Sequence, residues 1–214
     1  MLIEPLITML LLSFTLASLL LALAPGPDNI FVLTHSALYG ARSGIAVIVG
    51  LCLGIMIHTL CLIVGISALL AAYPTLLLFI KLLGVAYLSY LAYQAFLAAL
   101  KAQGMSTDHS QKLESKALIK RGFFMNITNP KVQLFFLSFF PQFLPPDAQG
   151  LNLALQILIL GLIFALATLL VFSIIALSST LLRSAFASPT FNRYLNGSAA
   201  FIFSALALYT LSNC

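Results

Sequence analysis

Charged and amide side chains are rare in this chain, and two groups of them interrupt long apolar segments, at Pro25-Gly26-Pro27-Asp28-Asn29 and at Asn129-Pro130-Lys131. Proline has no backbone N–H, so carbonyl groups one turn earlier in a helix lose their partners. In hydrocarbon, such carbonyl groups persist only where protein or water satisfies them. The two segments therefore predict helices that are broken at Pro25, Gly26, Pro27 and Pro130, with polar groups gathered at each break.

Asp28 and Lys131 carry the charges at the two breaks, and each has two interpretations. Asp28 can cap a second, interfacial helix, or it can bind an ammonium group or a proton in an unwound site; the two roles are compatible. Lys131 can extend to the lipid headgroups, or it can face a water-filled cavity. Lys131, Ser138 and Gln142 are spaced i, i+7 and i+11, which places them on one face of an α-helix and favours the cavity.

The chain also contains three histidines and three cysteines. His58 lies in the middle of an apolar segment, where it is either a hydrogen-bonded core residue or a group that carries protons or contacts substrate. His35, seven residues after Asp28, has the same alternatives. Cys52 and Cys61 lie inside an apolar segment and are expected to pack as small residues. Nine residues of helix separate them by about 13 Å, which is too far for a disulfide between them. No hydrolase, nucleotide-binding or metal-ligand motif occurs, so we expect no enzyme activity, metal or cofactor.

The composition places these residues in a membrane. Of 214 residues, 62% are apolar and 7% are charged, whereas a soluble domain carries about 25% charged residues. The net charge of +5 comes from scattered basic residues, which form no stripe suited to nucleic acid. A membrane-spanning helix needs roughly 20 apolar residues, and six segments satisfy this requirement: 5–36, 42–71, 74–100, 121–144, 151–181 and 192–212.

A polar segment at 101–120 divides the chain into two halves of three helices, 1–100 and 121–214. We expect a single transmembrane domain, residues 1–214, in which 101–120 is a cytoplasmic loop. Gly26-Pro27-Asp28 aligns with Asn129-Pro130-Lys131, and three helices per half would insert the two halves with opposite orientation. The predicted fold is an all-α membrane protein of six transmembrane helices, arranged as two inverted three-helix repeats whose first helices are broken.

Basic residues predict the orientation of this fold. Eight of the ten Lys and Arg residues lie in or beside the first, third and fifth connections between helices: Arg42, Lys101, Lys112, Lys116, Lys120, Arg121, Arg183 and Arg193. The opposite connections contain none, and the other two, Lys81 and Lys131, fall inside predicted helices. By the positive-inside rule, the eight residues face the cytoplasm. Both termini are therefore expected on the periplasmic side.

An ordered set of motifs runs along nearly the whole chain. They are Leu23-Ala24-Pro25-Gly26-Pro27-Asp28-Asn29, the spaced Gly40, Gly44, Gly50 and Gly54, Lys81-Leu82-Leu83-Gly84-Val85-Ala86-Tyr87-Leu88, Gly122-Phe123, Asn129-Pro130-Lys131, Phe135-Phe136 and Phe140-Pro141-Gln142-Phe143. Together they resemble the lysine exporter / homoserine–threonine resistance (LysE/RhtB) family. The resemblance implies an exporter of amino acids or close derivatives in the bacterial inner membrane, driven by the proton motive force.

The resemblance also narrows the expected substrate. The basic-amino-acid branch of the family carries an Asp in the second helix, where this chain has Ile55-Met56-Ile57-His58. An acidic group that could pair with a lysine or arginine side chain is missing there. The chain thus resembles the homoserine/threonine-type branch, which implies a neutral amino acid. A basic-amino-acid exporter, a membrane redox or thiol carrier that uses Cys52 and Cys61, and a bundle without transport activity stay as alternatives.

The expected mechanism is alternating access of the two halves around a site at the membrane midplane. The residues expected to bind substrate or couple protons are Asp28, Asn29, His58, Asn129, Lys131 and Gln142. Asp28 would attract the substrate ammonium or a proton, and Lys131 the carboxylate. We expect these two side chains to approach within about 4 Å in at least one conformation. The expected partners are an amino acid, protons and lipid; a homodimer is compatible with the sequence, and nucleic acid is not.

Overall fold

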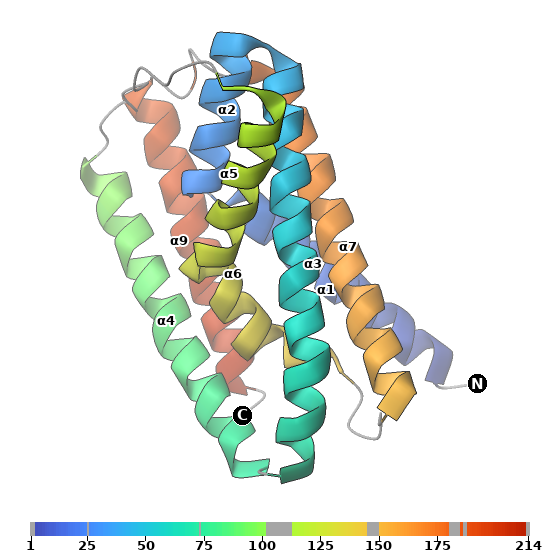
Figure 1. The fold of residues 1–214 in the computed structure, drawn as a ribbon. Helices are drawn as coiled ribbons and strands as arrows, with labels where there is room; N and C mark the ends of the chain where they lie inside the picture. The colour runs from blue at the N-terminus through green and yellow to red at the C-terminus, as the bar shows by residue number, and fades with distance from the viewer. Residues whose placement is uncertain are drawn as a thin grey trace.

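The structure is a computed structural model that describes residues 3–24, 26–72, 74–101, 113–144, 150–179, 185 and 188–212. Helices are the only regular elements in these ranges, and Figure 1 shows them as one bundle. They are α1 (Ile3–Leu23), α2 (Pro27–Tyr39), α3 (Ala41–Ala72), α4 (Pro74–Lys101), α5 (Ser115–Thr128), α6 (Pro130–Leu134), the π-helix η1 (Phe135–Phe139), the 3-10 helix η2 (Phe140–Phe143), α7 (Gly150–Leu177) and α9 (Pro189–Ser212).

The first predicted segment, 5–36, is broken where its prolines lie. Leu10–Leu23 and Pro27–Tyr39 meet at an angle of 61°. Gly26 is the N-cap of α2 in an extended conformation, and Pro27 occupies the first turn, where its missing N–H leaves no donor unsatisfied. Pro25 itself lies outside the described residues. The predicted break in the first segment is confirmed.

The fourth predicted segment, 121–144, is also broken, at Asn129 and Pro130. Its start is earlier than predicted, because α5 begins at Ser115. Residues 115–120 therefore belong to a helix and not to the 101–120 loop. No Pro or Gly stands in 115–120 to prevent a helix, although their polarity resembles that of a loop. After α6, the chain passes through π- and 3-10 turns instead of continuing as an α-helix.

Among the described residues, four helices are long and apolar enough to cross a membrane: Ala41–Gly65 of α3, Leu82–Lys101 of α4, α7 and α9. The bent pair of α1 and α2 adds a fifth if it forms one span. The class of all-α membrane protein is thereby confirmed. The division of the fourth segment into four short helices removes it from this count, so the number of six spans stays a prediction.

The helix ends alternate between two sides of the bundle. In Figure 1 the turn between α2 and α3, the end of α4 and the starts of α5 and α9 lie toward the top, while both chain ends lie in the lower half. Arg42, Lys101, Lys116 and Arg193 belong to the helix ends at the top. The fold therefore gathers these basic residues at one end, as the orientation prediction requires.

Close packing of α3 against α5 fixes the position of the second break. A Cβ atom built on Gly50 would come closer than 3.0 Å to backbone atoms of Ile119 and Phe123, and one on Gly122 would collide with the carbonyl oxygen of Val47. Such approaches of backbone to backbone are typical of small residues between membrane helices. The glycines therefore allow α5 to lie directly on α3, which sets where Asn126 and Asn129 project.

An aromatic cluster fixes the segment that follows the second break. The ring of Phe14 in α1 lies 5.9 Å from Phe135, 5.2 Å from Phe140 and 5.1 Å from Phe143, measured between centroids. Edge-to-face arrangements at such distances stabilise aromatic pairs beyond their burial. The cluster joins α1 to η1 and η2, so that both broken helices enter one core.

Candidate functional site

The Lys131 ammonium group binds the C-terminal end of α1. Lys131 Nζ donates hydrogen bonds to the carbonyl oxygens of Leu21, at 3.2 Å, and Ala24, at 3.0 Å. The Leu21 carbonyl has no helical donor, because residue 25 is a proline and proline has no N–H. Lys131 is only 8% exposed, and its ammonium group points into the bundle. The alternative that this side chain extends to the headgroups is therefore wrong for this conformation.

Asn29 satisfies another carbonyl group at the same helix end. Its Nδ2 donates to the carbonyl oxygen of Ala22 at 2.8 Å, and the side chain is buried. Three carbonyl groups at and just beyond the C-terminal end of α1, those of Leu21, Ala22 and Ala24, are thus bound by side chains. The C-terminal end of a helix carries a partial negative charge, so the Lys131 ammonium is also favourably placed electrostatically.

Asn129 connects the two breaks. Its Nδ2 donates to Asp28 Oδ2 at 2.7 Å, and its Oδ1 accepts from the backbone N–H of Lys131 at 3.0 Å. The second bond makes Asn129 the N-cap of α6. Asp28 does not cap α2, because Gly26 is the N-cap; Asp28 lies in the first turn, where a carboxylate is stabilised by the helix dipole.

Asp28 and Lys131 face the same small cavity without forming a direct ion pair. No distance of 4.0 Å or less joins the carboxylate to the ammonium group in the described chain. The direct contact predicted from the sequence is thus not formed in this conformation. Each charge is instead held by the other break, since Lys131 binds α1 and Asn129 binds Asp28.

The cavity has a volume of about 20 Å³, which is enough for about one water molecule. Three polar atoms in its wall have no hydrogen-bond partner among the described residues: Asp28 Oδ1, Asn126 Oδ1 and Thr168 Oγ1. Each buried polar atom without a partner costs about 1–3 kcal/mol. Its other lining residues are Leu21, Ala22, Leu51, Lys131, Val132, Phe164 and Phe172. A small site with unsatisfied acceptors and an ammonium group is suited to a polar ligand.

Neither Thr168 nor Asn126 was predicted as a site residue. Asn126 belongs to the polar group before Pro130, which is a usable signal. Thr168 lies within the long apolar helix α7 and is 4% exposed. A single threonine in such a helix is easily accommodated by bonding its own backbone, so the sequence alone gives no reason to single it out.

His58 lies beside the cavity and does not line it. His58 Nε2 is 3.4 Å from the carbonyl oxygen of Asn126, and the ring stacks on Phe136 at 5.3 Å between centroids. His58 is half-buried and lies within hydrogen-bond distance of a backbone carbonyl next to the site, which is compatible with both of its predicted roles. His35 is fully buried against Phe31 and Tyr39, and its ring nitrogens have no partner among the described residues.

Gln142 lies away from Asp28 and Lys131. Its Nε2 donates to Thr210 Oγ1 of α9 at 3.1 Å, and it does not line the cavity. The predicted common face with Lys131 assumed an uninterrupted α-helix, whereas the π-helix η1 and the 3-10 helix η2 change the angular spacing of the residues. The expectation that Gln142 shares the site is therefore wrong in this conformation. The side chain of Ser138 lies outside the described set.

The packing role expected for both cysteines fits Cys52, which is half-buried, and does not fit Cys61, which is exposed. Cys52 Sγ is 3.7 Å from the carbonyl oxygen of Ala165, and Cys61 is exposed on α3; both are free thiols. No group of three or more His, Cys, Asp or Glu side chains that could bind a metal ion occurs among the described residues.

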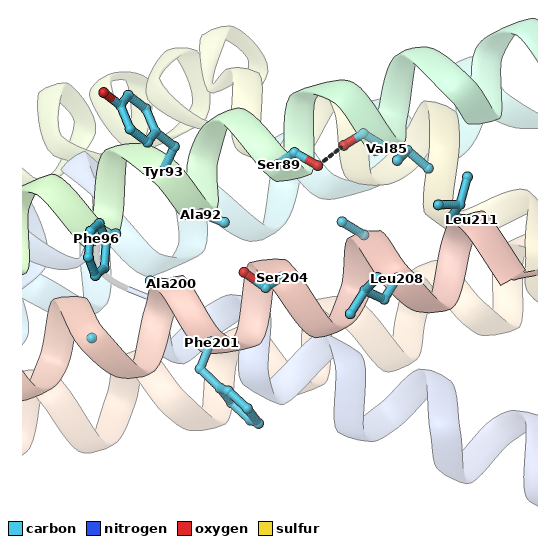
Figure 2. Close-up of a pocket in the computed structure, with 12 residues that line it drawn as sticks. Val85, Ser89, Ala92, Tyr93, Phe96, Ala200, Phe201, Ser204, Leu208 and Leu211 are labelled. Atoms are coloured by element: carbon cyan, nitrogen blue, oxygen red, sulfur yellow. Dashed lines mark hydrogen bonds between the residues drawn. The ribbon is translucent and has the colours of Figure 1, made fainter.

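A larger hollow lies between α4 and α9 and has a different character. Its volume is about 650 Å³, and its wall contains small and apolar residues with no charged side chain. Figure 2 shows Tyr93 and Phe96 of α4 and Phe201 of α9 along it, and a hydrogen bond from the Ser89 hydroxyl to the carbonyl oxygen of Val85. The three aromatic side chains are more than half exposed. This surface suits lipid better than a zwitterion.

Comparison with known proteins identifies the family. Residues 19–213 match the LysE type translocator family. An uncharacterised membrane protein of Vibrio cholerae is 31% identical over 71% of both chains, and one of Bacillus subtilis is 31% identical over 76% of this chain and 79% of its own. A leucine efflux protein of Klebsiella pneumoniae is 30% identical over 71% of both chains. No solved structure matches. These matches make the chain a membrane transporter rather than an enzyme, and it belongs to the LysE type translocator family.

Proposed function

We propose that this protein exports a small neutral amino acid across the bacterial inner membrane in exchange for protons. The observation that carries the proposal is the cavity in which Asp28, Asn126, Lys131 and Thr168 converge between two broken helices. A carboxylate and an ammonium group complement the two charged ends of an amino acid. Membrane transporters commonly place their substrate sites at such breaks.

Two further observations favour a neutral substrate. The relative from Klebsiella pneumoniae is named a leucine efflux protein, and leucine has an uncharged side chain. In this chain, residues 55–58 supply no acidic group to pair with the side chain of lysine or arginine. A homoserine- or threonine-like substrate is the finer form of the proposal, because Asn126 and Thr168 offer polar partners for a hydroxyl group.

Transport requires the cavity to open. A volume of about 20 Å³ holds about one water molecule, so the site is too small for an amino acid in this conformation. In the proposed cycle, the two halves alternate between sides of the membrane around Asp28 and Lys131. The substrate ammonium group would bind Asp28 and the α1 carbonyl groups, and its carboxylate would bind Lys131 and nearby backbone N–H groups.

Proton coupling is assigned to Asp28, with His58 as the next candidate. A carboxylate in a water-poor site can accept a proton, and the neutral form costs less to move through hydrocarbon. Asp28 Oδ1 has no partner in the described chain, so a proton could be added there without breaking the bond from Asn129 to Oδ2. His58 contacts the backbone of Asn126 and can change charge near neutral pH.

The orientation follows from the basic residues, with their end of the bundle in the cytoplasm and both termini in the periplasm. A cysteine at exposed Lys116 in the first turn of α5 should react with a membrane-impermeant maleimide only after cells are permeabilised. Labelling of this cysteine in intact cells would contradict the predicted orientation and indicate the opposite one.

The proposed function is tested by counterflow in proteoliposomes loaded with an amino-acid mixture. We expect uptake of labelled leucine or threonine, inhibited by other neutral amino acids and unaffected by lysine or arginine. Inhibition by the basic amino acids alone would favour a basic-amino-acid exporter, and no counterflow with any amino acid would contradict the proposal. A thiol carrier is disfavoured by the separation of Cys52 and Cys61, and replacing both with serine should leave counterflow intact.

A further inference from the structure

The Lys131 ammonium group occupies a place that a free ammonium group could also fill. The carbonyl oxygens of Leu21 and Ala24 accept hydrogen bonds from Lys131 Nζ, while the carbonyl group between them in sequence, that of Ala22, is satisfied by Asn29. An ammonium group is a compact cation with three donors. Leu21 and Ala24 therefore offer the kind of site that any primary ammonium group would bind.

The surroundings of this site offer an excess of acceptors. Asp28 Oδ1 and Asn126 Oδ1 are buried without partners in the described chain, and both residues line the same cavity as Lys131. The Thr168 hydroxyl, which can also accept, is unpartnered there too. One lysine side chain does not satisfy all of these groups. The ammonium group of a substrate would bring three further N–H donors and a positive charge to these acceptors, in addition to those of Lys131.

We propose that the Leu21 and Ala24 carbonyl groups, together with Asp28, form a binding subsite for a primary ammonium group, and that the Lys131 side chain is its tethered occupant. In the transport cycle, the ammonium group of the substrate displaces that of Lys131, which then becomes free to bind the substrate carboxylate. After substrate release, Lys131 returns and closes the subsite. This inference rests on the proposed function and deepens it.

The tether has a consequence for binding. A group held by a short flexible chain competes at an effective concentration in the millimolar range or above. Free amines should therefore bind the unmodified protein weakly, and they should bind much more tightly once the Lys131 side chain is removed.

The test uses Lys131→Ala, which removes three methylene groups and the ammonium group, the atoms of n-propylammonium. The amine is protonated at neutral pH, as lysine is. We expect n-propylammonium to raise the Tm of purified Lys131→Ala saturably and to leave the unmodified protein unchanged. Lys131→Met is the matched control, because its side chain fills the same volume without charge; it should not respond. n-Propanol, of similar shape and uncharged, should not stabilise Lys131→Ala.

Absence of any stabilisation of Lys131→Ala by the amine, or equal stabilisation of all three proteins, would overturn the subsite. Adding Asp28→Asn to Lys131→Ala should weaken amine binding by at least about tenfold. If Lys131→Ala cannot be purified alone, the yield of monodisperse protein is measured with and without the amine during solubilisation. Recovery only with the amine supports the proposal, and failure with the amine while Lys131→Met is recovered contradicts it.

Two leucine derivatives connect the subsite to the substrate. Leucinol retains the ammonium group without the carboxylate, whereas N-acetyl-leucine retains the carboxylate without the ammonium group. Leucinol should stabilise Lys131→Ala and compete with n-propylammonium, and N-acetyl-leucine should do neither; the reverse result would overturn the assignment. Amine binding without amino-acid counterflow would leave the subsite standing and contradict the proposed function. Counterflow without amine binding would overturn the proposed subsite and leave the proposed function standing.

Discussion

The two broken helices of this protein satisfy their backbone groups in different ways. The second break is largely self-contained: Asn129 caps α6 with its own side chain, and its carbonyl group accepts from the N–H groups of Val132 and Gln133. At the first break, α1 and α2 meet at 61°, and Gly26 has no side chain to cap α2.

The first break therefore depends on the second. Lys131 Nζ binds two carbonyl groups of α1, and Asn129 Nδ2 binds the Asp28 carboxylate. Both donors come from the second break, more than 100 positions along the chain. We infer that the second break is the support and the first is the part whose hydrogen bonds can be exchanged with a substrate. Substitutions at the two breaks should consequently differ in what they change.

The largest effect is expected at Asp28. Asp28→Asn keeps the shape of the side chain and removes its negative charge and its ability to carry a proton. With a pH gradient as the sole driving force, uphill export should fall to background, while some exchange between internal and external amino acid survives. His58→Gln is the comparison, because His58 lies beside the cavity; it should slow export without abolishing it. If Asp28→Asn exports amino acid uphill at the rate of the unmodified protein, Asp28 does not carry the coupled proton.

A smaller effect is expected from Asn129→Asp. The replacement has the same shape, but it removes the donor to Asp28 and places a second carboxylate about 2.7 Å from the first. Loss of a hydrogen bond to a charged group costs about 1.5–3 kcal/mol, and repulsion adds to it. Thermal unfolding should show a lower Tm. Asn152→Asp, at an exposed position of α7, is the control; an equal loss there would show that the link between the breaks contributes nothing.

The smallest effect concerns the packing that supports the second break. Gly50→Ala would force its Cβ against the backbone of α5, at a cost of about 1–3 kcal/mol for overpacking. Gly65→Ala, on the same helix, meets nothing within 4 Å and should be neutral or stabilising by up to about 1 kcal/mol. The two variants are compared by Tm and by counterflow. Equal behaviour would mean that contact between α3 and α5 does not position the site.

Much of this arrangement could be predicted from residue types. Proline without an N–H predicts the breaks, and charges in apolar segments predict that Asp28 and Lys131 turn inward. The sequence does not show how the two charges are held, because that depends on the carbonyl groups of Leu21 and Ala24, which any residue type carries. A direct ion pair was therefore the simplest expectation, and it was replaced by bonds to backbone and to Asn129.

Local helix geometry limited the remaining predictions. Gln142 was expected beside Lys131 on the basis of a regular α-helix, and the π- and 3-10 turns after Leu134 direct it to Thr210 instead. Thr168 could not be distinguished from other single hydroxyl residues in apolar helices. The start of α5 was placed six residues late, because polar residues at the end of a helix resemble those of a loop.

The central claim is that Asp28 and Lys131 act as a unit across the two breaks. It is tested most directly by the Tm values of Asp28→Asn, Lys131→Met and the double variant. Removing one of two opposite buried charges leaves the other uncompensated, whereas removing both can be nearly neutral. The double variant should therefore unfold at a higher temperature than Lys131→Met alone, with a coupling energy of at least about 1 kcal/mol. Losses that simply add would show two independent charges and contradict the account.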